Sequence, residues 1–320
     1  MNARLYKITD LEDKPLVSVV IPCYNQGRFL PEAIQSVKDQ TYPNIEIIVV
    51  NDGSTDCTNE SVKSFTGIKY FEQGNLGLPN ARNRGMKESK GKYVTFLDAD
   101  DLLYPDAVEK NLPYLIQNPA LAFVSGRFLG INEKGKTWVP KTHLVDKNHY
   151  IAMLQTNYIG NPAAVLYSRW ILDICPFDTS PKIKGCEDYD HYLKITRSYP
   201  VKHHQESICI YRKHGGNMSD DYLMMLESVL HTLNRQLHLL QTEEEINAFQ
   251  IGIVEWKGMY LNWIFESLLH KDIEVIPKFR KKMFWKFRKD ILQIFWIKFK
   301  IKTKSLLVKT DKASHHDLFR

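Results

Sequence analysis

The sequence predicts an α/β protein whose mostly parallel, Rossmann-type sheet is flanked by helices and followed by an α-helical C-terminal region. Three observations support this prediction. Short β-branched runs alternate with helical patterns through the first half of the chain. Polar clusters follow three of the expected strands at the point where each strand ends. Strand patterns stop near residue 217, and helical patterns dominate from about residue 219 to residue 304.

The expected strands of the first half are short and apolar. They cover residues 17–21, 45–50, 68–71, 93–97 and 121–124. Runs that are apolar almost throughout are typical of strands buried on both faces.

Helices are expected between these strands. Pro31 stands early in the first of them, where its fixed φ suits the opening turn. Residues 54–56 offer caps for a helix that reaches about Phe65, and further helices are expected over about 78–89 and from near Pro105. Repeated strand–helix–strand units with right-handed crossovers build a mostly parallel sheet.

The second half of the chain is less regular. A loop-rich stretch, a return to the sheet, a helix and a strand are expected at 126–160, 161–166, 187–198 and 206–212, respectively. We place a domain boundary at residue 217, between an α/β domain (1–217) and a helical C-terminal region (218–320).

Composition excludes several classes of protein. The chain has 320 residues, 43% of them hydrophobic and 25% charged, which excludes wholesale disorder and low-complexity sequence. The five cysteines have no CxxC spacing, so neither a zinc ribbon nor a disulfide framework is indicated. Residues 1–14 lack the apolar core of a signal peptide, and no window of about 18 apolar residues exists. We therefore expect a cytoplasmic protein, with membrane contact limited to the inner face of the cell membrane.

The densest acid cluster follows the expected strand at 93–97. Asp98 and Asp100 point to the same side of an extended chain, because side chains alternate. Carboxylates grouped this closely repel unless a cation or a proton joins them. One or two carboxylates plus substrate phosphates form the usual magnesium site. The alternative is that Asp100 and Asp101 only cap the next helix. We expect one of them to do so, but capping does not need three acids, so we favour a divalent metal.

Residues 75–85 combine glycines and amides at a helix start with Arg82 and Arg84 in the first turns. A helix N-terminus beside an arginine is a good anion site, although a surface helix with solvated arginines has the same pattern. The dinucleotide glycine fingerprint and the P-loop lysine motif are both absent from the sequence, which removes the main support for nicotinamide and kinase-type functions.

A second acid cluster, Glu187 and Asp188, opens the expected helix at 187–198, with Asp190 as a nearby competitor for any role. Such acids are ordinarily caps favoured by the helix dipole. His203 and His204 are expected at the surface. His214, just past the strand expected at 206–212, is placed to reach the same site, although a lone histidine is more often structural.

Taken together, these segments resemble the family 2 glycosyltransferases, which have the GT-A fold. The resemblance runs from residue 15 to about residue 219, and its motifs occur in the family's order. They lie at 17–25, 50–56, 75–85, 96–101, 187–190 and 211–219. The resemblance implies a GT-A-like catalytic domain over 1–217 that transfers a sugar from a nucleotide diphosphate donor with inversion, using Mn²⁺ or Mg²⁺.

Donor-binding residues carry over onto the first motifs. Pro22, Tyr24 and Asp52 would hold the nucleoside, with Asp52 accepting a hydrogen bond from the base. Asn51 stands where the family usually has an aspartate, which leaves Asp52 as the only carboxylate there.

The remaining roles carry over onto the later motifs. Arg82 would lie near the diphosphate, Asp98 would sit at the ribose and the donor, and Asp100 would bind the metal. Asp188 would be the catalytic base. His214 matches the histidine that in some members approaches the metal or the diphosphate, and we assign it to the metal site.

The function expected from this resemblance is transfer from a nucleotide sugar, expected to be a UDP-sugar, to a hydroxyl of a glycan or lipid-linked acceptor in cell-surface polysaccharide synthesis. One alternative is a sugar nucleotidyltransferase, but that class has a Gly-rich, Arg-containing loop after the first strand, where this chain has residues 22–27. The other is a non-catalytic glycan-binding protein, for which Asp98, Asp100 and Asp188 would have no use.

The charge of the chain is concentrated near its C-terminus. Residues 278–304 carry eleven Lys and Arg against one Asp, a net charge of +10, whereas the whole chain carries +6. With Trp285 and Trp296 in the same segment, this pattern favours an interfacial helix that contacts anionic lipid headgroups. The alternative is a helix packed on the catalytic domain with a solvated charged face. We expect no nucleic-acid partner, because the nucleotide-sugar site expected in this chain argues against nucleic-acid binding.

Overall fold

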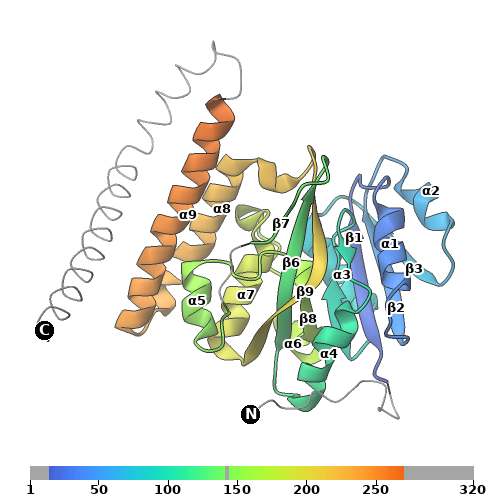
Figure 1. The fold of residues 1–320 in the computed structure, drawn as a ribbon, viewed down its shortest axis with the longest axis horizontal. Coiled ribbons are helices and arrows are strands. Elements are labelled where there is room, and N and C mark those ends of the chain that lie inside the picture. Colours follow the sequence, from blue (N-terminus) through green and yellow to red (C-terminus); the bar gives the residue numbers. More distant parts are fainter. Residues whose placement is uncertain (1–13, 141–143, 270–320) are drawn as a thin grey trace, which may run out of the picture.

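The computed structural model describes residues 14–140 and 144–269 (Figure 1). Within these ranges the strands are β1 (Val17–Cys23), β2 (Ile45–Asp52), β3 (Ile68–Gln73), β4 (Tyr93–Phe96), β5 (Leu102–Leu103), β6 (Phe123–Asn132), β7 (Thr137–Trp138), β8 (Val165–Ser168) and β9 (Val201–Lys213). The α-helices are α1 (Leu30–Lys38), α2 (Thr58–Lys63), α3 (Leu78–Glu88), α4 (Ala107–Gln117), α5 (His149–Gln155), α6 (Arg169–Ile174), α7 (Glu187–Ser198), α8 (Tyr222–Asn234) and α9 (Glu243–Leu269).

The first half of the sheet is parallel, as the sequence predicts. β3, β2, β1 and β4 lie side by side in that order, and each neighbouring pair is parallel. β1 is buried along its whole length, which accounts for its apolar run. Because Cys23 pairs with Asn51 and Val20 with Phe96, the segments that follow β1, β2 and β4 leave the sheet at one edge. The three predicted polar clusters therefore meet there.

Helix α3 approaches the sheet closely at Gly85. A Cβ at this position would lie 2.2 Å from Val20 Cγ1 and 3.2 Å from Val50 Cγ2. Only glycine allows this contact between the helix and strands β1 and β2. The contact fixes the helix that carries Arg82 one turn earlier.

The second half of the sheet is mixed. β8 lies between β4 and β6 and is antiparallel to both, whereas β9 is parallel to β6. β6 and β9 are longer than predicted, and residues 126–132, which were expected in a loop, continue β6. Gly126 explains the error, because it breaks the sequence pattern while the strand runs through it. A Cβ there would lie 2.3 Å from Ile208 Cγ1, and the pairing with β9 changes register at this point.

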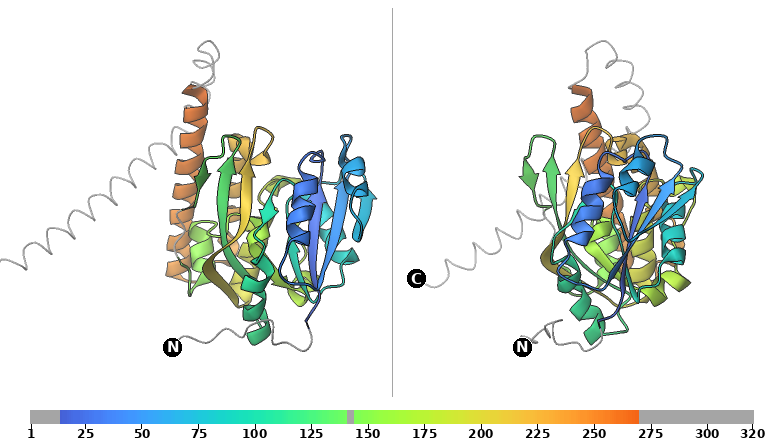
Figure 2. Two further views of the ribbon diagram at one scale, coloured as in Figure 1. Left: turned by 45° about the vertical axis from the view of Figure 1, so that its right-hand side comes forward. Right: turned by 90° about the vertical axis from the view of Figure 1, so that its right-hand side faces the viewer.

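Helices α8 and α9 lie side by side beyond β6 and β9, at the end of the molecule away from β3 and α2 (Figures 1 and 2). The main hydrophobic core includes side chains from both sides of residue 217, such as Tyr192 and Leu226, and the domain boundary stays a prediction. The basic segment 278–304 lies outside the described residues. Within 14–140 and 144–269, no helix combines the length and apolar character needed to cross a membrane.

The surface placement expected for His203 and His204 is wrong. Both side chains are buried in β9, where His203 Nδ1 lies 3.0 Å from Ser125 Oγ and His204 Nε2 lies 2.8 Å from Asn111 Oδ1. Burial lowers the pKa of each histidine to about 4, so both are neutral at physiological pH. Their polar partners lie on β6 and α4, far away in the sequence, and local polarity could not reveal them.

Candidate active site

The loops that follow β1 and β2 are tied together at the carboxyl edge of the sheet. Asn25 N donates to Ser54 Oγ at 2.9 Å, and Gly27 N donates to Asp56 Oδ2 at 2.8 Å. Gly27 is needed for this approach, because a Cβ there would lie 2.5 Å from Thr58 N. These contacts join the two loops into one rim at this edge of the sheet.

Pro22 and Tyr24 lie at the start of this rim. Pro22 is buried in β1 opposite Val50, whereas Tyr24 is 47% exposed. An exposed aromatic ring on a loop that is hydrogen-bonded to its neighbour is suited to stacking on a planar base. Their predicted role at the nucleoside stays a prediction.

Asp52 and Asn51 are both buried at the end of β2. Asp52 Oδ1 accepts from Gln73 Nε2 at 2.8 Å and from Leu76 N at 2.9 Å, and its Oδ2 accepts from Gly77 N at 2.8 Å. Asn51 Nδ2 donates to Tyr70 Oη at 2.9 Å. Asp52 thus anchors the loop that leads into α3, in addition to the predicted contact with the base.

Arg82 joins the two predicted acid clusters. Its Nη2 lies 2.8 Å from Asp98 Oδ1, and its Nη1 lies 2.7 Å from Glu187 Oε1. The side chain is only 1% exposed, and the guanidinium carbon lies 5.5 Å from the centre of the Phe177 ring. A guanidinium buried this deeply requires carboxylate partners. Sequence reasoning expected Arg82 at the diphosphate and did not pair it with Glu187.

Asp188 lies in the first turn of α7, next to Glu187, and is half-buried. Its Oδ1 accepts from Tyr189 N at 2.7 Å. Burial, reinforced by the negative charge of Glu187 and opposed by Arg82, raises the pKa of Asp188 to about 7. A carboxyl group with this pKa exchanges protons readily near neutral pH, which is what a general base requires.

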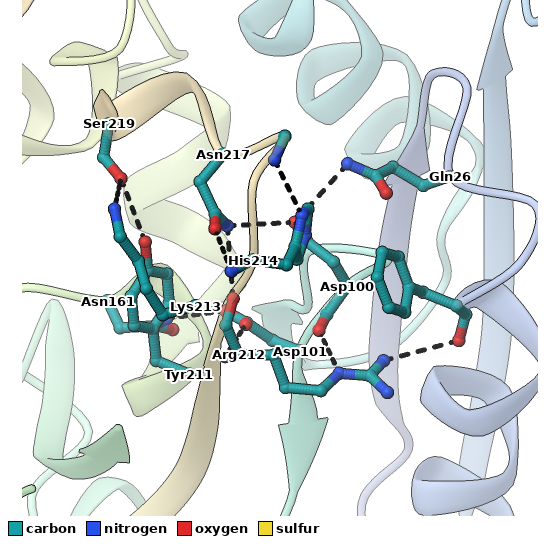
Figure 3. A network of polar contacts seen from close by, with 12 residues as sticks. Gln26, Asp100, Asp101, Asn161, Tyr211, Arg212, Lys213, His214, Asn217 and Ser219 are labelled. Carbon is teal, nitrogen blue, oxygen red and sulfur yellow. Dashed lines mark hydrogen bonds and ion pairs between the residues drawn. The ribbon is translucent and has the colours of Figure 1, made fainter. Parts of the chain in front are cut away.

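Asp100 and His214 meet where β9 returns to the edge of the sheet (Figure 3). Asp100 Oδ2 lies 3.0 Å from His214 Nε2, 3.4 Å from Gln26 Nε2 and 3.5 Å from Asn217 Nδ2. Gly216 N donates to His214 Nδ1 at 3.1 Å, which assigns the ring proton of neutral His214 to Nε2. His214 therefore donates to Asp100 in this arrangement. Its predicted role as a metal ligand stays a prediction.

Asp101 has a structural role that sequence reasoning missed. Its Oδ1 accepts from Arg212 N at 2.9 Å and its Oδ2 accepts from Asn161 Nδ2 at 2.7 Å (Figure 3). The next helix, α4, begins at Ala107 with Asp106 at its cap position, so the expectation that Asp100 or Asp101 caps it is wrong. The third acid of the cluster fastens the loop after β4 to β9. Asn161 and Arg212 carry no sequence signal of this role, since only the fold brings them together.

The donor set at this edge suits a hard divalent cation. Burial, together with the charge of Asp98, raises the pKa of Asp100, and a cation between the two carboxylates would relieve their repulsion. Within 14–140 and 144–269, no three His, Cys, Asp or Glu side chains gather closely enough to form a cage for a metal. Oxygen ligands from one or two carboxylates, completed by substrate phosphates, are what Mg²⁺ or Mn²⁺ requires. Asp100, with Asp98 beside it, fits that arrangement.

Comparison with known proteins identifies the family. The model of the family described as Glycosyl transferase family 2 matches residues 18–173. An uncharacterized glycosyltransferase of Rickettsia prowazekii is 33% identical over 240 residues, which cover 72% of this chain and 74% of that protein. The chain belongs to the family 2 glycosyltransferases. An uncharacterized glycosyltransferase of Haemophilus influenzae is 28% identical and matches 91% of this chain and 96% of its own length. This chain covers only 25% of a longer uncharacterized glycosyltransferase of Rickettsia conorii, with 40% identity over 154 residues.

Solved structures share the fold of this family 2 glycosyltransferase. Staphylococcus aureus TarS 1-349 in complex with UDP has a TM-score of 0.56 and 20% identity, covering 82% of this chain and 78% of TarS 1-349. The mannosyltransferase PcManGT of Pyrobaculum calidifontis, in complex with GDP-Man and Mn²⁺, has a TM-score of 0.58 and 15% identity, covering 85% of this chain and 80% of its own. The predicted GT-A-like fold class is confirmed.

Proposed function

We propose that this chain is an inverting glycosyltransferase that moves a sugar from a nucleotide diphosphate-sugar to a hydroxyl of a glycan or lipid-linked acceptor. The observation that supports this most is the pairing of Arg82 with both Asp98 and Glu187, which joins the loop after β4 to the helix that carries Asp188. One site thereby contains a candidate donor-binding carboxylate and a candidate base.

In the proposed reaction, Asp188 accepts the proton of the acceptor hydroxyl as the oxygen attacks the anomeric carbon. The bond from that carbon to the diphosphate oxygen breaks on the opposite face, so the configuration inverts. A base with a pKa of about 7 is partly ionised at neutral pH and can take up this proton. Tyr189 N holds the carboxylate in its orientation.

We propose that Asp100, with Asp98 beside it, holds a divalent cation together with the donor diphosphate. When bound, Mn²⁺ or Mg²⁺ would neutralise the charge that develops on the departing nucleoside diphosphate. His214 would position Asp100 through its Nε2 proton. It would become a ligand through Nε2 only if the ring proton moved to Nδ1, which would end the hydrogen bond from Gly216 N.

We propose a UDP-sugar as the donor, held by Pro22, Tyr24 and Asp52. Support comes from TarS, whose structures contain UDP or UDP-GlcNAc, although PcManGT contains GDP-Man. The acceptor is proposed as a growing glycan of the cell surface. The basic segment 278–304 is proposed to bring the enzyme to the inner face of the membrane, without spanning it.

The test is an assay of donor turnover with a panel of UDP-sugars and GDP-mannose, in the presence of Mn²⁺, Mg²⁺ or EDTA. Release of nucleoside diphosphate that depends on the cation and on Asp188 supports the transferase. In a parallel assay that supplies a nucleoside triphosphate and a sugar 1-phosphate, release of pyrophosphate would instead identify a nucleotidyltransferase, and no turnover in either assay would identify a glycan-binding protein. Binding of the chain to vesicles with anionic lipid, compared with neutral vesicles, tests the membrane contact separately.

A further inference from the structure

Glu187, which pairs with Arg82, has no assigned part in the proposed reaction itself. Both side chains are nearly inaccessible, at 5% and 1% exposed, and the pair is short at 2.7 Å. A buried ion pair often contributes little net stability compared with apolar packing, because both charges lose their hydration. Its position immediately beside the candidate base therefore calls for a functional explanation.

The geometry connects this pair to both sides of the site. Glu187 precedes Asp188 in the first turn of α7, and the second nitrogen of Arg82 is held by Asp98. We propose that Glu187 is a positioning residue, which fixes the Arg82 guanidinium beside Asp188 and so sets the charge around the base. The proposal rests on the proposed function, since it assigns Glu187 a part in the same reaction.

Few groups near Asp188 carry charge at neutral pH. Within residues 14–140 and 144–269, the titratable neighbours include Cys186, Glu187 and Tyr192 at α7, Arg82 of α3, Asp98 after β4, Tyr167 of β8 and Tyr260 of α9. Burial raises the pKa of the thiol and of the three phenols, so these four remain neutral. Among the described side chains, the largest charge effects on Asp188 therefore come from Arg82, Asp98 and Glu187.

These three charges make the effect of Glu187 predictable in sign. Glu187 and Asp98 disfavour ionisation of Asp188, whereas Arg82 favours it. Without the charge of Glu187, Arg82 is matched by Asp98 alone, and the carboxylate form of Asp188 becomes easier to form. The base would then keep its ionised form at lower pH.

The first experiment measures kcat/KM between about pH 5 and pH 8 for the wild type, Glu187→Gln, Glu187→Asp and Glu60→Gln. Glu60 is an exposed acid of α2 and serves as the control for loss of one negative charge. We expect the acid limb to move down by about one pH unit in Glu187→Gln and to stay in place in Glu187→Asp and Glu60→Gln. Glu187→Asp keeps the charge but shortens the reach to Arg82, so its kcat should fall about tenfold with little change in donor KM.

A uniform loss of activity in Glu187→Gln, with the acid limb of the pH profile unmoved, would leave Glu187 only a structural role and overturn the proposal.

The second experiment does not depend on turnover. NMR of the aspartate carboxyl carbons follows the titration of Asp188, whose signal is assigned by its loss in Asp188→Asn. The midpoint should fall in Glu187→Gln relative to the wild type. If the midpoint falls while the wild type transfers no sugar, the proposed function fails and the electrostatic role of Glu187 stands; an unmoved midpoint overturns that role even in an active enzyme.

Discussion

The two acid clusters of the site look alike in sequence but are held in different ways. The donor-side cluster consists of Asp98, Asp100 and Asp101, and the base-side cluster consists of Glu187, Asp188 and Asp190. In each cluster one almost fully buried carboxylate serves as an anchor, Asp101 on the donor side and Asp190 on the base side, while Glu187 is buried against Arg82. Asp101 accepts hydrogen bonds from two uncharged groups, a backbone N–H and an amide. Asp190 is instead paired with two cations, Lys194 at 2.6 Å and Arg235 at 3.2 Å.

This difference shows that neighbouring carboxylates in one cluster can have different structural roles. On the donor side, burial raises the pKa of Asp101 well above its usual range, since neutral donors offset its charge only in part. On the base side, ion pairs hold α7 against the loop at Asp178, which also contacts Lys194 and Arg235. In both clusters the anchor is distinct from the acid that we propose to act in the reaction, Asp100 or Asp188.

The largest expected effect comes from replacing Asp188, the proposed base, rather than Asp190, the anchor of the same cluster. Asp188→Asn should reduce transfer about a thousandfold, because the amide cannot accept the acceptor proton. Donor affinity should stay near the wild-type value, because the donor-side cluster is untouched. Initial rates and calorimetric donor binding measure the two quantities. Comparable turnover in the variant would contradict the assignment of the base.

The second effect is on the stability of the base-side anchor. Asp190→Asn removes the charge that Lys194 and Arg235 share, and should lower the free energy of unfolding by about 3 kcal/mol. A larger cost is not expected, because both cations are 34% exposed and keep their contacts with Asp178. Urea unfolding measures the change. A loss below about 1 kcal/mol would show that the ion pairs do not anchor α7.

The donor-side anchor should cost less to break. Asp101→Asn keeps one acceptor oxygen but turns an amide group toward either Arg212 N or Asn161, so one hydrogen bond is lost. We expect a decrease of about 1 to 2 kcal/mol in the free energy of unfolding. The same urea experiment compares the two anchors directly. A cost above that of Asp190→Asn would reverse the contrast between the clusters.

Much of this arrangement could be predicted from the sequence, for definite physical reasons. β1 to β4 and helices α3 and α7 follow from local patterns, because strands buried on both faces are continuously apolar and helices have their own period. The parallel order of the strands then places the polar clusters of 22–25, 51–54 and 98–101 at one edge. The position of these three clusters at one edge could therefore be predicted without knowing any side-chain contact.

The partners of each acid could not be predicted in the same way. Glu187 meets Arg82 across 105 positions of sequence, and Asp101 meets Arg212 across 111. Such pairs depend on how β9 and α7 return to the edge of the sheet, and no local pattern encodes that return. The same limit explains why the burial of His203 and His204 and the continuation of β6 through Gly126 were missed.

The smallest expected effect tests whether burial, rather than ion pairing as such, makes Asp190 an anchor. Glu88 pairs with Arg84 one turn away on α3 at 2.9 Å, but the Arg84 side chain is 44% exposed and that of Glu88 is 28% exposed. Water screens this pair, so Glu88→Gln should change the free energy of unfolding by less than about 0.5 kcal/mol.

Urea unfolding in low and high salt measures both this variant and Asp190→Asn. Since salt weakens exposed pairs far more than buried ones, the small cost of Glu88→Gln should vanish at high salt while most of the cost of Asp190→Asn remains. If the two variants lowered the free energy of unfolding equally, the burial of Asp190 would add nothing to the strength of its ion pairs. Only the hydrogen bonds of Asp101 would then distinguish the two clusters.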